Sequence, residues 1–333
     1  MNNEEVMCVR GLKVLFNGIE GLVRAVENVD LTVHAGECVA IVGESGCGKS
    51  VTGLSMMRLL QTPPAIWRAK ELRYTRETGE TVDLLTAPEA ELEKLRGAEI
   101  SMIYQDPSAA LNPVMTIGEQ LEEVYRYHTK LSKQEAKAAG IEMLRRVGIP
   151  APEKRYAQFP HELSGGMKQR VLIAMAMALQ PRLLIADEPT TALDVTIQAQ
   201  ILDLLRELCA REHTALIILT HDLGVVRSLA DDVYVMYCGK IMEQGTVDEV
   251  LGCPKHPYTR GLIASVPSVE DTVTRFHQIP GNVPSPMEKP RGCYFSSRCA
   301  CCMEICRQKM PNLRTLEDGR KIRCHLEGGE HHV

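Results

Sequence analysis

The feature that most constrains the fold is a glycine-rich segment near the N-terminus, Gly43-Glu44-Ser45-Gly46-Cys47-Gly48-Lys49-Ser50. It follows an apolar run at 38–42 and precedes a stretch with helical character at 51–60. Strand, glycine loop and helix in this order are the context of a phosphate-binding loop. The N–H groups of such a loop converge on an anion, at the positive end of the helix dipole. The segment therefore predicts a nucleotide site rather than a flexible turn.

Two side chains of this loop have chemistry suited to a nucleotide. Lys49 can reach the β- and γ-phosphates, and the Ser50 hydroxyl can complete the shell of a Mg²⁺ ion. Cys47 is expected to be a small filler rather than a reactive nucleophile. The residues expected to bind the nucleotide here are Gly43, Ser45, Gly46, Cys47, Gly48, Lys49, Ser50 and Val51.

Composition and charge limit the functional class. A chain of 333 residues can hold two domains, or one large domain with an appendage. Its net charge of −5 argues against a nucleic-acid binder. No apolar run reaches the length of a membrane span, and the acidic N-terminus does not resemble a signal peptide. We therefore expect a cytosolic protein with no nucleic-acid partner.

Two apolar runs, 183–186 and 215–219, have the continuous character of strands buried on both faces of a parallel sheet. A helix is predicted between them at 196–211, which gives a βαβ unit and an α/β fold. Asp187 and Glu188 follow the first strand and His221 follows the second. Ligands bind at this edge of open α/β sheets. Asp187 is suited to hold Mg²⁺, Glu188 to act as general base, and His221 to contact the γ-phosphate or orient the water.

The remaining pattern predicts further elements in chain order. Residues 6–36 alternate as strands of an antiparallel sheet, and 235–237 precede a turn at 238–240 and a short strand. Proline density then predicts an extended linker. The other predicted elements are a hairpin at 68–82, a helix at 89–96, a strand at 100–104 that ends at Gln105, and helices at 116–131 and 133–147.

A second anion-binding helix start is predicted at Leu163-Ser164-Gly165-Gly166-Met167-Lys168-Gln169-Arg170. Ser164 is a good N-cap, and Gly165 and Gly166 let a phosphate approach the backbone. One nucleotide needs only one such helix start for its phosphates. A head-to-tail dimer, in which this loop closes on the nucleotide of a partner, resolves the duplication.

These motifs together resemble the ATPases of ABC transporters. Residues 43–50 match the Walker A motif, Gln105 the Q-loop, 163–170 the signature, 183–187 Walker B and 192–194 the D-loop. The resemblance implies a P-loop NTPase fold with a mixed sheet core, an antiparallel β subdomain and an α-helical subdomain at 106–180, within an ATP-binding domain at 1–250. It also implies ATP hydrolysis with Mg²⁺ held by Ser50, Gln105 and Asp187. Phe16 is a weak candidate for stacking on adenine.

Segments 105–113, 162–170, 189–196 and 256–259 are similar to the D-type subunits of oligopeptide and dipeptide importers. That likeness implies an F-type ATPase partner, two membrane permeases and, indirectly, an external binding protein. It implies peptide uptake driven from the cytoplasmic face of the inner membrane. Asn112-Pro113 and residues 114–130 are candidates for the permease contact. The nickel-importer branch is an alternative, as is an ABC ATPase unrelated to transport, and a non-enzymatic redox or iron sensor is a third reading.

Six of the twelve cysteines fall between Cys293 and Cys324, in a module predicted at 291–333 after the linker at 251–290. They read as thiols or metal ligands rather than disulfides. The resemblance to dipeptide-importer D subunits implies a [4Fe–4S] cluster held by Cys293, Cys299, Cys306 and Cys324. Zinc and free thiols remain alternatives, and Cys301 and Cys302 are alternative ligands.

Overall fold

The computed structural model describes residues 4–18, 21–191, 193–266 and 278–326. The chain forms two compact units, each assembled from several segments. The first contains Met1–Met7, Thr32–Glu37 and Arg73–Ile218. The second contains Cys8–Leu31, Cys38–Leu72 and Leu219–Val333.

The second unit contains the strand that leads into the phosphate loop. This strand, β3 (Cys38–Val42), pairs in parallel with β10 (Asp232–Tyr237), and β10 pairs in antiparallel fashion with β11 (Lys240–Thr246). Two short strands extend the sheet, β13 (Lys321–Ile322) beside β11 and β12 (Arg314–Thr315) beside β13. The predicted turn between β10 and β11 is confirmed, with Cys238 and Gly239 at positive φ. The last strands bring the C-terminal region onto the edge of this sheet.

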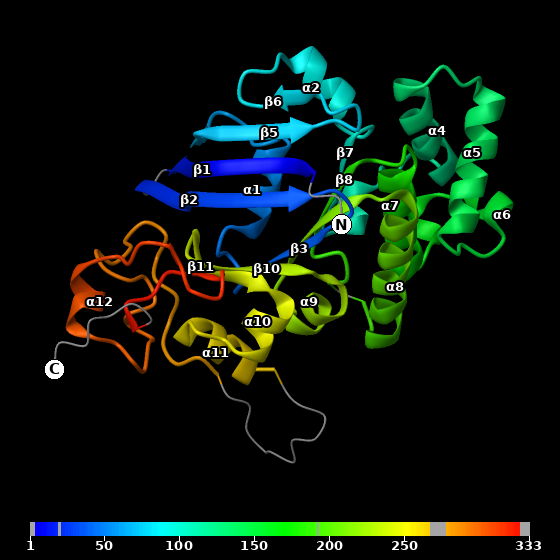
Figure 1. Ribbon diagram of the computed structural model, residues 1–333. Helices are drawn as coiled ribbons and strands as arrows, with labels where there is room; N and C mark the ends of the chain where they lie inside the picture. The colour runs from blue at the N-terminus through cyan, green and yellow to red at the C-terminus, as the bar shows by residue number, and fades with distance from the viewer. Residues whose placement is uncertain (1–3, 19–20, 192, 267–277, 327–333) are drawn as a thin grey trace. The chain divides into compact units, whose positions relative to one another are not determined.

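The antiparallel sheet predicted from residues 6–36 is confirmed. It is built on β1 (Glu5–Gly18) and β2 (Gly21–His34), whose arrows run in opposite directions in Figure 1. Within the second unit β1 also pairs with β4 (Ala65–Arg68), with Lys13 opposite Arg68. Burial alternates only over the second half of β2, whereas β1 is buried from Val6 to Leu12 apart from Arg10.

The helix after the phosphate loop is α1 (Lys49–Met56), which ends four residues before the predicted end at 60. Arg58 adopts a left-handed conformation, with φ of 52°. The N–H of Leu59 then bonds back to the Leu54 carbonyl at 2.9 Å. This bond satisfies a carbonyl at the helix terminus and stops the helix.

The first unit contains the parallel strands predicted to carry the acidic residues. β7 (Ile100–Ile103) pairs in parallel with β8 (Leu183–Asp187), with Ile100 opposite Leu183. β8 is flanked on its other side by β9 (Ala215–Thr220), whose first four residues belong to this unit. The predicted hairpin is formed by β5 (Glu71–Thr75) and β6 (Thr81–Asp83). All five residues of β8 are buried, as expected for a strand covered on both faces.

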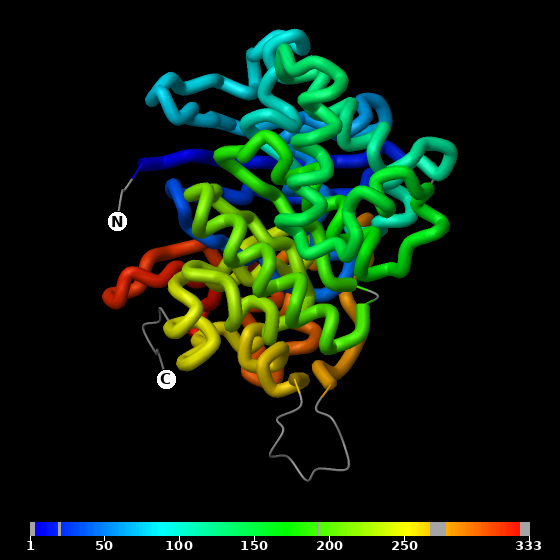
Figure 2. Tube along the Cα trace, turned by 90° about the vertical axis from the view of Figure 1, so that its right-hand side faces the viewer, coloured from blue at the N-terminus to red at the C-terminus, as the bar shows by residue number. Residues whose placement is uncertain are grey.

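Helices make up most of the rest of the first unit, and they confirm the predicted helical region. α4 packs on α5, and α7 packs against both, visible as the green coils of Figure 2. Capping boxes of Thr116 with Glu119 and of Ser132 with Glu135 begin α4 and α5. The helices are α2 (Glu89–Leu95), α3 (Pro107–Ala110), α4 (Ile117–His128), α5 (Lys133–Arg146), α6 (Pro152–Tyr156), the 3₁₀ helix η1 (Pro160–Glu162), α7 (Gly165–Met177) and α8 (Val195–Glu212).

The proline-rich stretch was predicted from its composition to be an extended linker, and this is wrong for its first part. Residues Pro257–Ala264 form α11, and α10 (Val247–Gly252) precedes it. The side chain of His256 caps α11, and Pro257 occupies its first turn, where a missing N–H costs nothing. The second unit also contains α9 (Leu223–Leu229) and α12 (Glu304–Gln308).

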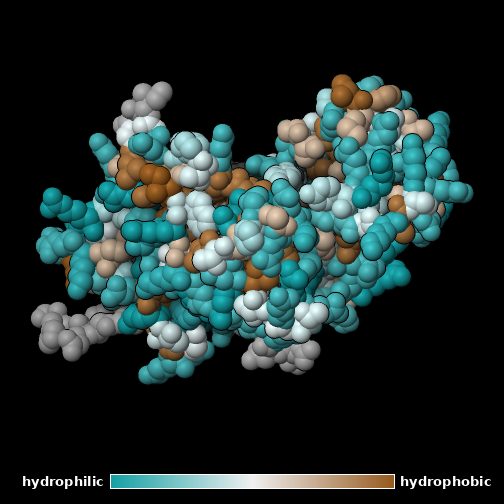
Figure 3. Space-filling view, turned by 90° about the horizontal axis from the view of Figure 1, so that it is seen from above, coloured by the Kyte–Doolittle hydropathy of each residue, from teal (hydrophilic) through white to brown (hydrophobic). Residues whose placement is uncertain are grey.

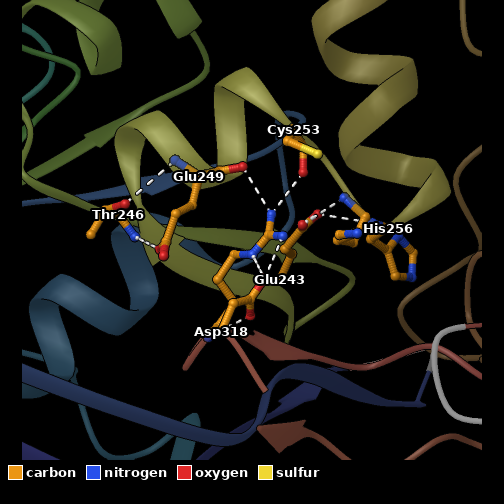
Figure 4. Close-up of polar contacts among 8 residues, drawn as sticks. Glu243, Thr246, Glu249, Cys253, His256 and Asp318 are labelled. Atoms are coloured by element: carbon orange, nitrogen blue, oxygen red, sulfur yellow. Dashed lines mark hydrogen bonds and ion pairs between the residues drawn. The ribbon is translucent and has the colours of Figure 1, made fainter. Parts of the chain in front are cut away.

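Arg320 lies between β12 and β13 and connects this C-terminal hairpin to α10. This guanidinium donates to the carbonyls of Glu249 and Cys253 at 2.9 and 2.7 Å and pairs with the Asp318 carboxylate. Figure 4 shows Glu249, Cys253 and Asp318 close to Glu243, whose carboxylate accepts hydrogen bonds from the backbone N–H groups of Lys255 and His256. The Arg320 side chain is only 6% exposed, so the contact is part of the packed structure.

The described helices are all too short or too polar to cross a membrane. The surface in Figure 3 is largely hydrophilic, with limited hydrophobic areas. Apolar side chains are instead concentrated on the strands, including β8 and β9.

Candidate active site

The phosphate loop is shaped by close backbone approaches that only glycine allows. A Cβ added at Gly43 would lie 2.1 Å from the Met236 carbonyl oxygen. One added at Gly48 would lie 2.6 Å from the Ala25 carbonyl oxygen, and Gly48 has φ of 110°. The loop therefore packs tightly against β10 and β2 within the second unit, and this packing requires glycine at positions 43 and 48.

Lys49 lies against the loop that it follows. Its side chain is buried, and its Nζ donates to the carbonyl oxygens of Gly43 at 2.8 Å and Glu44 at 3.3 Å. Burial raises the pKa of the nearby Cys47 thiol, more than the Lys49 charge lowers it. The thiol is therefore protonated at neutral pH, which supports the prediction that Cys47 is a filler. Ser50 lies in the first turn of α1.

The predicted catalytic carboxylates follow one another at the end of β8. Asp187 is the last residue of the strand and is 6% exposed. Glu188 has φ of 45°, a left-handed conformation that is unusual for a side chain of this kind. Its Oε2 accepts hydrogen bonds from Gln105 Nε2 at 3.1 Å and from Thr191 Oγ1 at 2.8 Å. The structure thus brings Gln105 and Glu188 together, although they are far apart in the sequence.

The second predicted anion site also lies in the first unit, at the start of α7. Ser164 is its N-cap, and Ser164 Oγ accepts a hydrogen bond from the Met167 N–H at 3.4 Å. Gly165 and Gly166 are the first helical residues. A Cβ at Gly166 would lie 2.9 Å from Ile197 Cγ2 on α8, so glycine is needed for the packing of the two helices. Of the predicted D-loop, Ala192 lies outside the described residues.

The predicted site residues fall in both units. Gln105, Asp187, Glu188 and the Ser164 segment belong to the first unit, whereas the phosphate loop and His221 belong to the second. His221 follows β9 and is exposed, just before α9. The joint geometry of these residues around one nucleotide stays a prediction.

Three residues in contact with the site were not assigned a role from the sequence. Thr191 bonds to Glu188, and Tyr258 and Arg298 both bond to Glu44 of the phosphate loop. Tyr258 lies in segment 256–259, whose similarity to importer subunits marked it out, although it predicted no contact with the phosphate loop. Arg298 carries no local signal, because its partner is 254 positions away.

The cysteine-rich region contains a small pocket of about 10 Å³, which is partly open to solvent. Burial, reinforced by neighbouring thiols, raises the pKa of Cys293 to about 12 and that of Cys299 to about 11. No disulfide joins the twelve cysteines, all of which lie in the described ranges. In that part of the chain, no three His, Cys, Asp or Glu side chains are grouped so as to hold one metal ion. The cysteines that line the pocket are Cys293, Cys299, Cys301, Cys306 and Cys324.

Known protein families match most of the chain. Residues 26–191 match the family described as ABC transporter, and residues 242–306 match the family described as oligopeptide/dipeptide transporter, C-terminal region. The oligopeptide transport ATP-binding protein AppD of Bacillus subtilis is 46% identical over 325 residues, which cover 97% of this chain and 98% of that protein. The oligopeptide transport ATP-binding protein OppD of Haemophilus influenzae is 46% identical over 323 residues and 96% of each chain.

Solved structures show the same fold. A dimeric ATP-binding cassette in a post-hydrolysis state bound to ADP and Pi matches with a TM-score of 0.62 and 26% identity, over 72% of this chain and 98% of that one. The cassette cbiO1 of Clostridium perfringens matches with a TM-score of 0.60 and 27% identity, over 75% of this chain and 92% of that one. The P-loop ABC ATPase fold predicted from the motifs is therefore confirmed. The chain belongs to the ABC transporter family and, within it, to the ATP-binding proteins of oligopeptide and dipeptide transport.

Proposed function

We propose that this chain hydrolyses ATP to drive the uptake of di- or oligopeptides through partner permeases. The observation that carries the hydrolytic part is the Glu188 carboxylate, which Gln105 and Thr191 hold directly after Asp187. It lies at the carboxyl end of a buried parallel strand, where α/β folds bind their ligands. The names of the relatives support peptides as the transported class.

The phosphate loop and three further side chains are assigned to Mg-ATP. The loop N–H groups other than that of Glu44, together with the Lys49 amine, would bind the phosphates and stabilise the charge that develops in the transition state. Ser50, Gln105 and Asp187 would hold Mg²⁺, because hydroxyl, amide and carboxylate oxygens are the ligands that this ion prefers. When bound there, Mg²⁺ would supply positive charge that offsets the negative charge of the phosphates.

Glu188 is assigned as the general base that accepts a proton from the attacking water. Its two hydrogen bonds fix the orientation of the carboxylate before the reaction and therefore reduce the reorganisation that is needed. His221 is assigned to contact the γ-phosphate and orient the water.

The capped start of α7 is assigned to the nucleotide of a second ATPase subunit. Ser164, Gly165 and Gly166 offer free helix-start N–H groups, which suit a γ-phosphate. Hydrolysis therefore requires two cassettes, and an F-type chain is the proposed partner. Two permeases complete the complex, with the binding protein as an indirect partner, and place this chain peripherally on the cytoplasmic face of the inner membrane.

The permease contact is assigned to the segment after Gln105. The Asn112 N–H donates to Gln120 Oε1 at 2.9 Å and the Gln120 amide donates back to the Asn112 carbonyl at 3.0 Å, which fixes this loop on α4. Val114 and Tyr127 are 79% and 68% exposed, so apolar side chains here are available to a partner helix. A change at Gln105 can therefore pass through the loop to α4.

Reconstitution of the chain with its permeases and second ATPase in proteoliposomes tests this function. We expect ATP-dependent uptake of a labelled peptide, which Lys49→Ala abolishes. Uptake of nickel in place of peptide would favour the nickel-importer alternative. Co-purification with nucleic acid or ribosomes rather than permeases would contradict a role in transport, and absence of ATP hydrolysis would favour a sensor.

We also propose that the cysteine pocket holds a [4Fe–4S] cluster through Cys293, Cys299, Cys306 and Cys324. Four thiolates are the usual ligand set of such a cluster, and all four line one pocket. Zinc, bound by the same sulfurs at about 2.3 Å, is the alternative metal. The described side chains form no preassembled group of donors for either metal, so only the measured metal content decides between them. Cys301 lines the same pocket and is the alternative ligand.

Iron and acid-labile sulfide in anaerobically purified protein test the cluster. We expect Cys306→Ser to lose iron and Cys302→Ser, which alters a cysteine outside the pocket lining, to retain it. Stoichiometric zinc, or no metal at all, would contradict the cluster. Cys301→Ser decides whether the fifth cysteine of the pocket is a ligand.

A further inference from the structure

Glu44 of the phosphate loop is engaged through its N–H, its side chain and its carbonyl. Its N–H donates to the Tyr258 hydroxyl at 3.0 Å, so this N–H points to α11. Its carboxylate accepts two hydrogen bonds from Arg298, at 2.7 and 2.9 Å. Its carbonyl accepts from the Lys49 amine at 3.3 Å. Glu44 therefore links the C-terminal region directly to the lysine of the loop.

Arg298 is rigidly fixed by its own surroundings. Its side chain is 5% exposed, and its guanidinium lies over the rings of Tyr237 and Phe295 at 5.8 and 5.9 Å. Besides Glu44, it donates to the Pro280 carbonyl at 3.1 Å, the Tyr237 hydroxyl at 3.3 Å and the Ile279 carbonyl at 3.3 Å. These five bonds match the five N–H donors of a guanidinium. Because its guanidinium is fixed by these contacts, Arg298 can in turn restrict the movement of the Glu44 carboxylate.

The electrostatics of the pair are matched. The hydrogen bond to Glu44 is the main cause that raises the pKa of Arg298 above its ordinary value. A bidentate pair of this kind defines both distance and orientation, which a lysine cannot reproduce. The Glu44 carboxylate is 25% exposed, so it remains partly accessible to water while Arg298 is covered.

We propose that Arg298 is a positioning residue for ATP binding. It acts through Glu44, whose fixed backbone sets the shape of the loop and the location of the Lys49 amine. Tyr258 supports the same residue from α11. The inference rests on the proposed role of residues 43–50 in binding ATP, and it assigns to the cysteine-rich region the role of bracing the phosphate loop.

The test compares two buried arginines of the same region in the full-length chain. Arg298→Gln removes the pair with Glu44, whereas Arg320→Gln removes a guanidinium of similar burial whose bonds go to Asp318, Glu249 and Cys253. We expect Arg298→Gln to weaken Mg-ATP binding about 10-fold, the loss of a hydrogen-bonded charge pair. Arg320→Gln lowers the thermal midpoint but leaves the ATP dissociation constant within about 2-fold.

A double-mutant cycle separates positioning from general destabilisation. If Arg298 acts through Glu44, then Glu44→Gln with Arg298→Gln binds ATP no more weakly than Arg298→Gln alone. Arg298→Lys gives an intermediate affinity for ATP, because lysine keeps the positive charge but cannot make the two parallel hydrogen bonds to the carboxylate. Unchanged ATP affinity in Arg298→Gln, or equal weakening by Arg320→Gln, overturns the inference. Normal ATP binding by Lys49→Ala would instead overturn the proposed role of the loop.

Discussion

The amide of Gln105 donates a hydrogen bond to the carboxylate of Glu188, with 3.1 Å between Nε2 and Oε2. The two residues follow β7 and β8, which are neighbouring parallel strands. Because the amide uses its N–H on Glu188, its oxygen remains available to a cation. One side chain can thus hold the proposed base and still serve the Mg²⁺ ion.

Glu188→Gln is expected to bind Mg-ATP but to lose turnover. The substitution preserves shape and removes the proton acceptor, so phosphate release at saturating ATP should fall by about 10²–10⁴-fold. Single-turnover phosphate release and equilibrium nucleotide binding measure the two effects separately. Thr191→Val, which removes only the 2.8 Å bond to the same carboxylate, is the matched control and should cost much less. Turnover at the unmodified rate in Glu188→Gln would rule out its assignment as base.

Gly166→Ala is expected to impair hydrolysis in the assembled transporter. Alanine favours a helix over glycine by about 1 kcal/mol, but overpacking costs about 1–3 kcal/mol. At this position the new Cβ would lie 2.9 Å from Ile197 Cγ2, so the clash should outweigh the gain and lower the thermal midpoint. Adding Ile197→Ala should restore the midpoint.

The ATPase rates of Gly166→Ala and of the double variant with Ile197→Ala distinguish a packing role of Gly166 from contact with a phosphate. If the Cβ also blocks the partner's nucleotide, Ile197→Ala restores stability but not the ATPase rate. Full recovery of the rate would show that Gly166 serves packing alone.

Cys47→Ser is expected to leave Mg-ATP affinity within about 2-fold, because the thiol is a protonated filler rather than a nucleophile. Isothermal titration with Mg-ATP measures this directly. A large loss of affinity would show that the sulfur has a specific role in the loop, 4.0 Å from the Lys49 amine.

The parts of the site that the sequence predicts are those encoded locally. The phosphate loop, the strand ending at Asp187 and the capped helix at Ser164 each depend on neighbouring residues. Their element types were therefore predictable, although α1 ends early at a left-handed Arg58. Proline density alone misjudged α11, because Pro257 at a first helical turn favours a helix start.

Contacts between distant positions were not predictable in the same way. Glu44 and Arg298 are 254 positions apart, and Gln105 and Glu188 are 83 apart. Such pairs depend on how strands and helices pack, which one sequence does not encode in any local pattern. Gln105 could be assigned a role through the family resemblance, whereas no motif in the sequence around Arg298 indicated its contact with Glu44.

His256 couples the stability of the C-terminal region to pH. It is 1% exposed, and its Nδ1 accepts the Tyr258 N–H at 3.0 Å, so the ring is neutral. Its pKa is lowered from 6.5 to about 3, mainly by burial; a hydrogen bond with the Arg323 backbone opposes the shift, and the charge of Arg260 adds to it. The Glu243 carboxylate, which accepts the His256 N–H at 3.0 Å, also faces this segment.

Acid should therefore destabilise the protein through His256. The unfolded chain gains a proton below pH 6.5 and the folded chain does not, so this contribution is complete above pH 6.5 and is lost as the pH falls toward 3. The expected slope is about 1.4 kcal/mol per pH unit in that window. His256→Asn, which can still cap α11 but does not titrate, should lose less stability between about pH 7.5 and 5.5 in urea unfolding. Parallel curves for the two proteins would mean that His256 takes up its proton equally in both states, and that the acid sensitivity lies elsewhere.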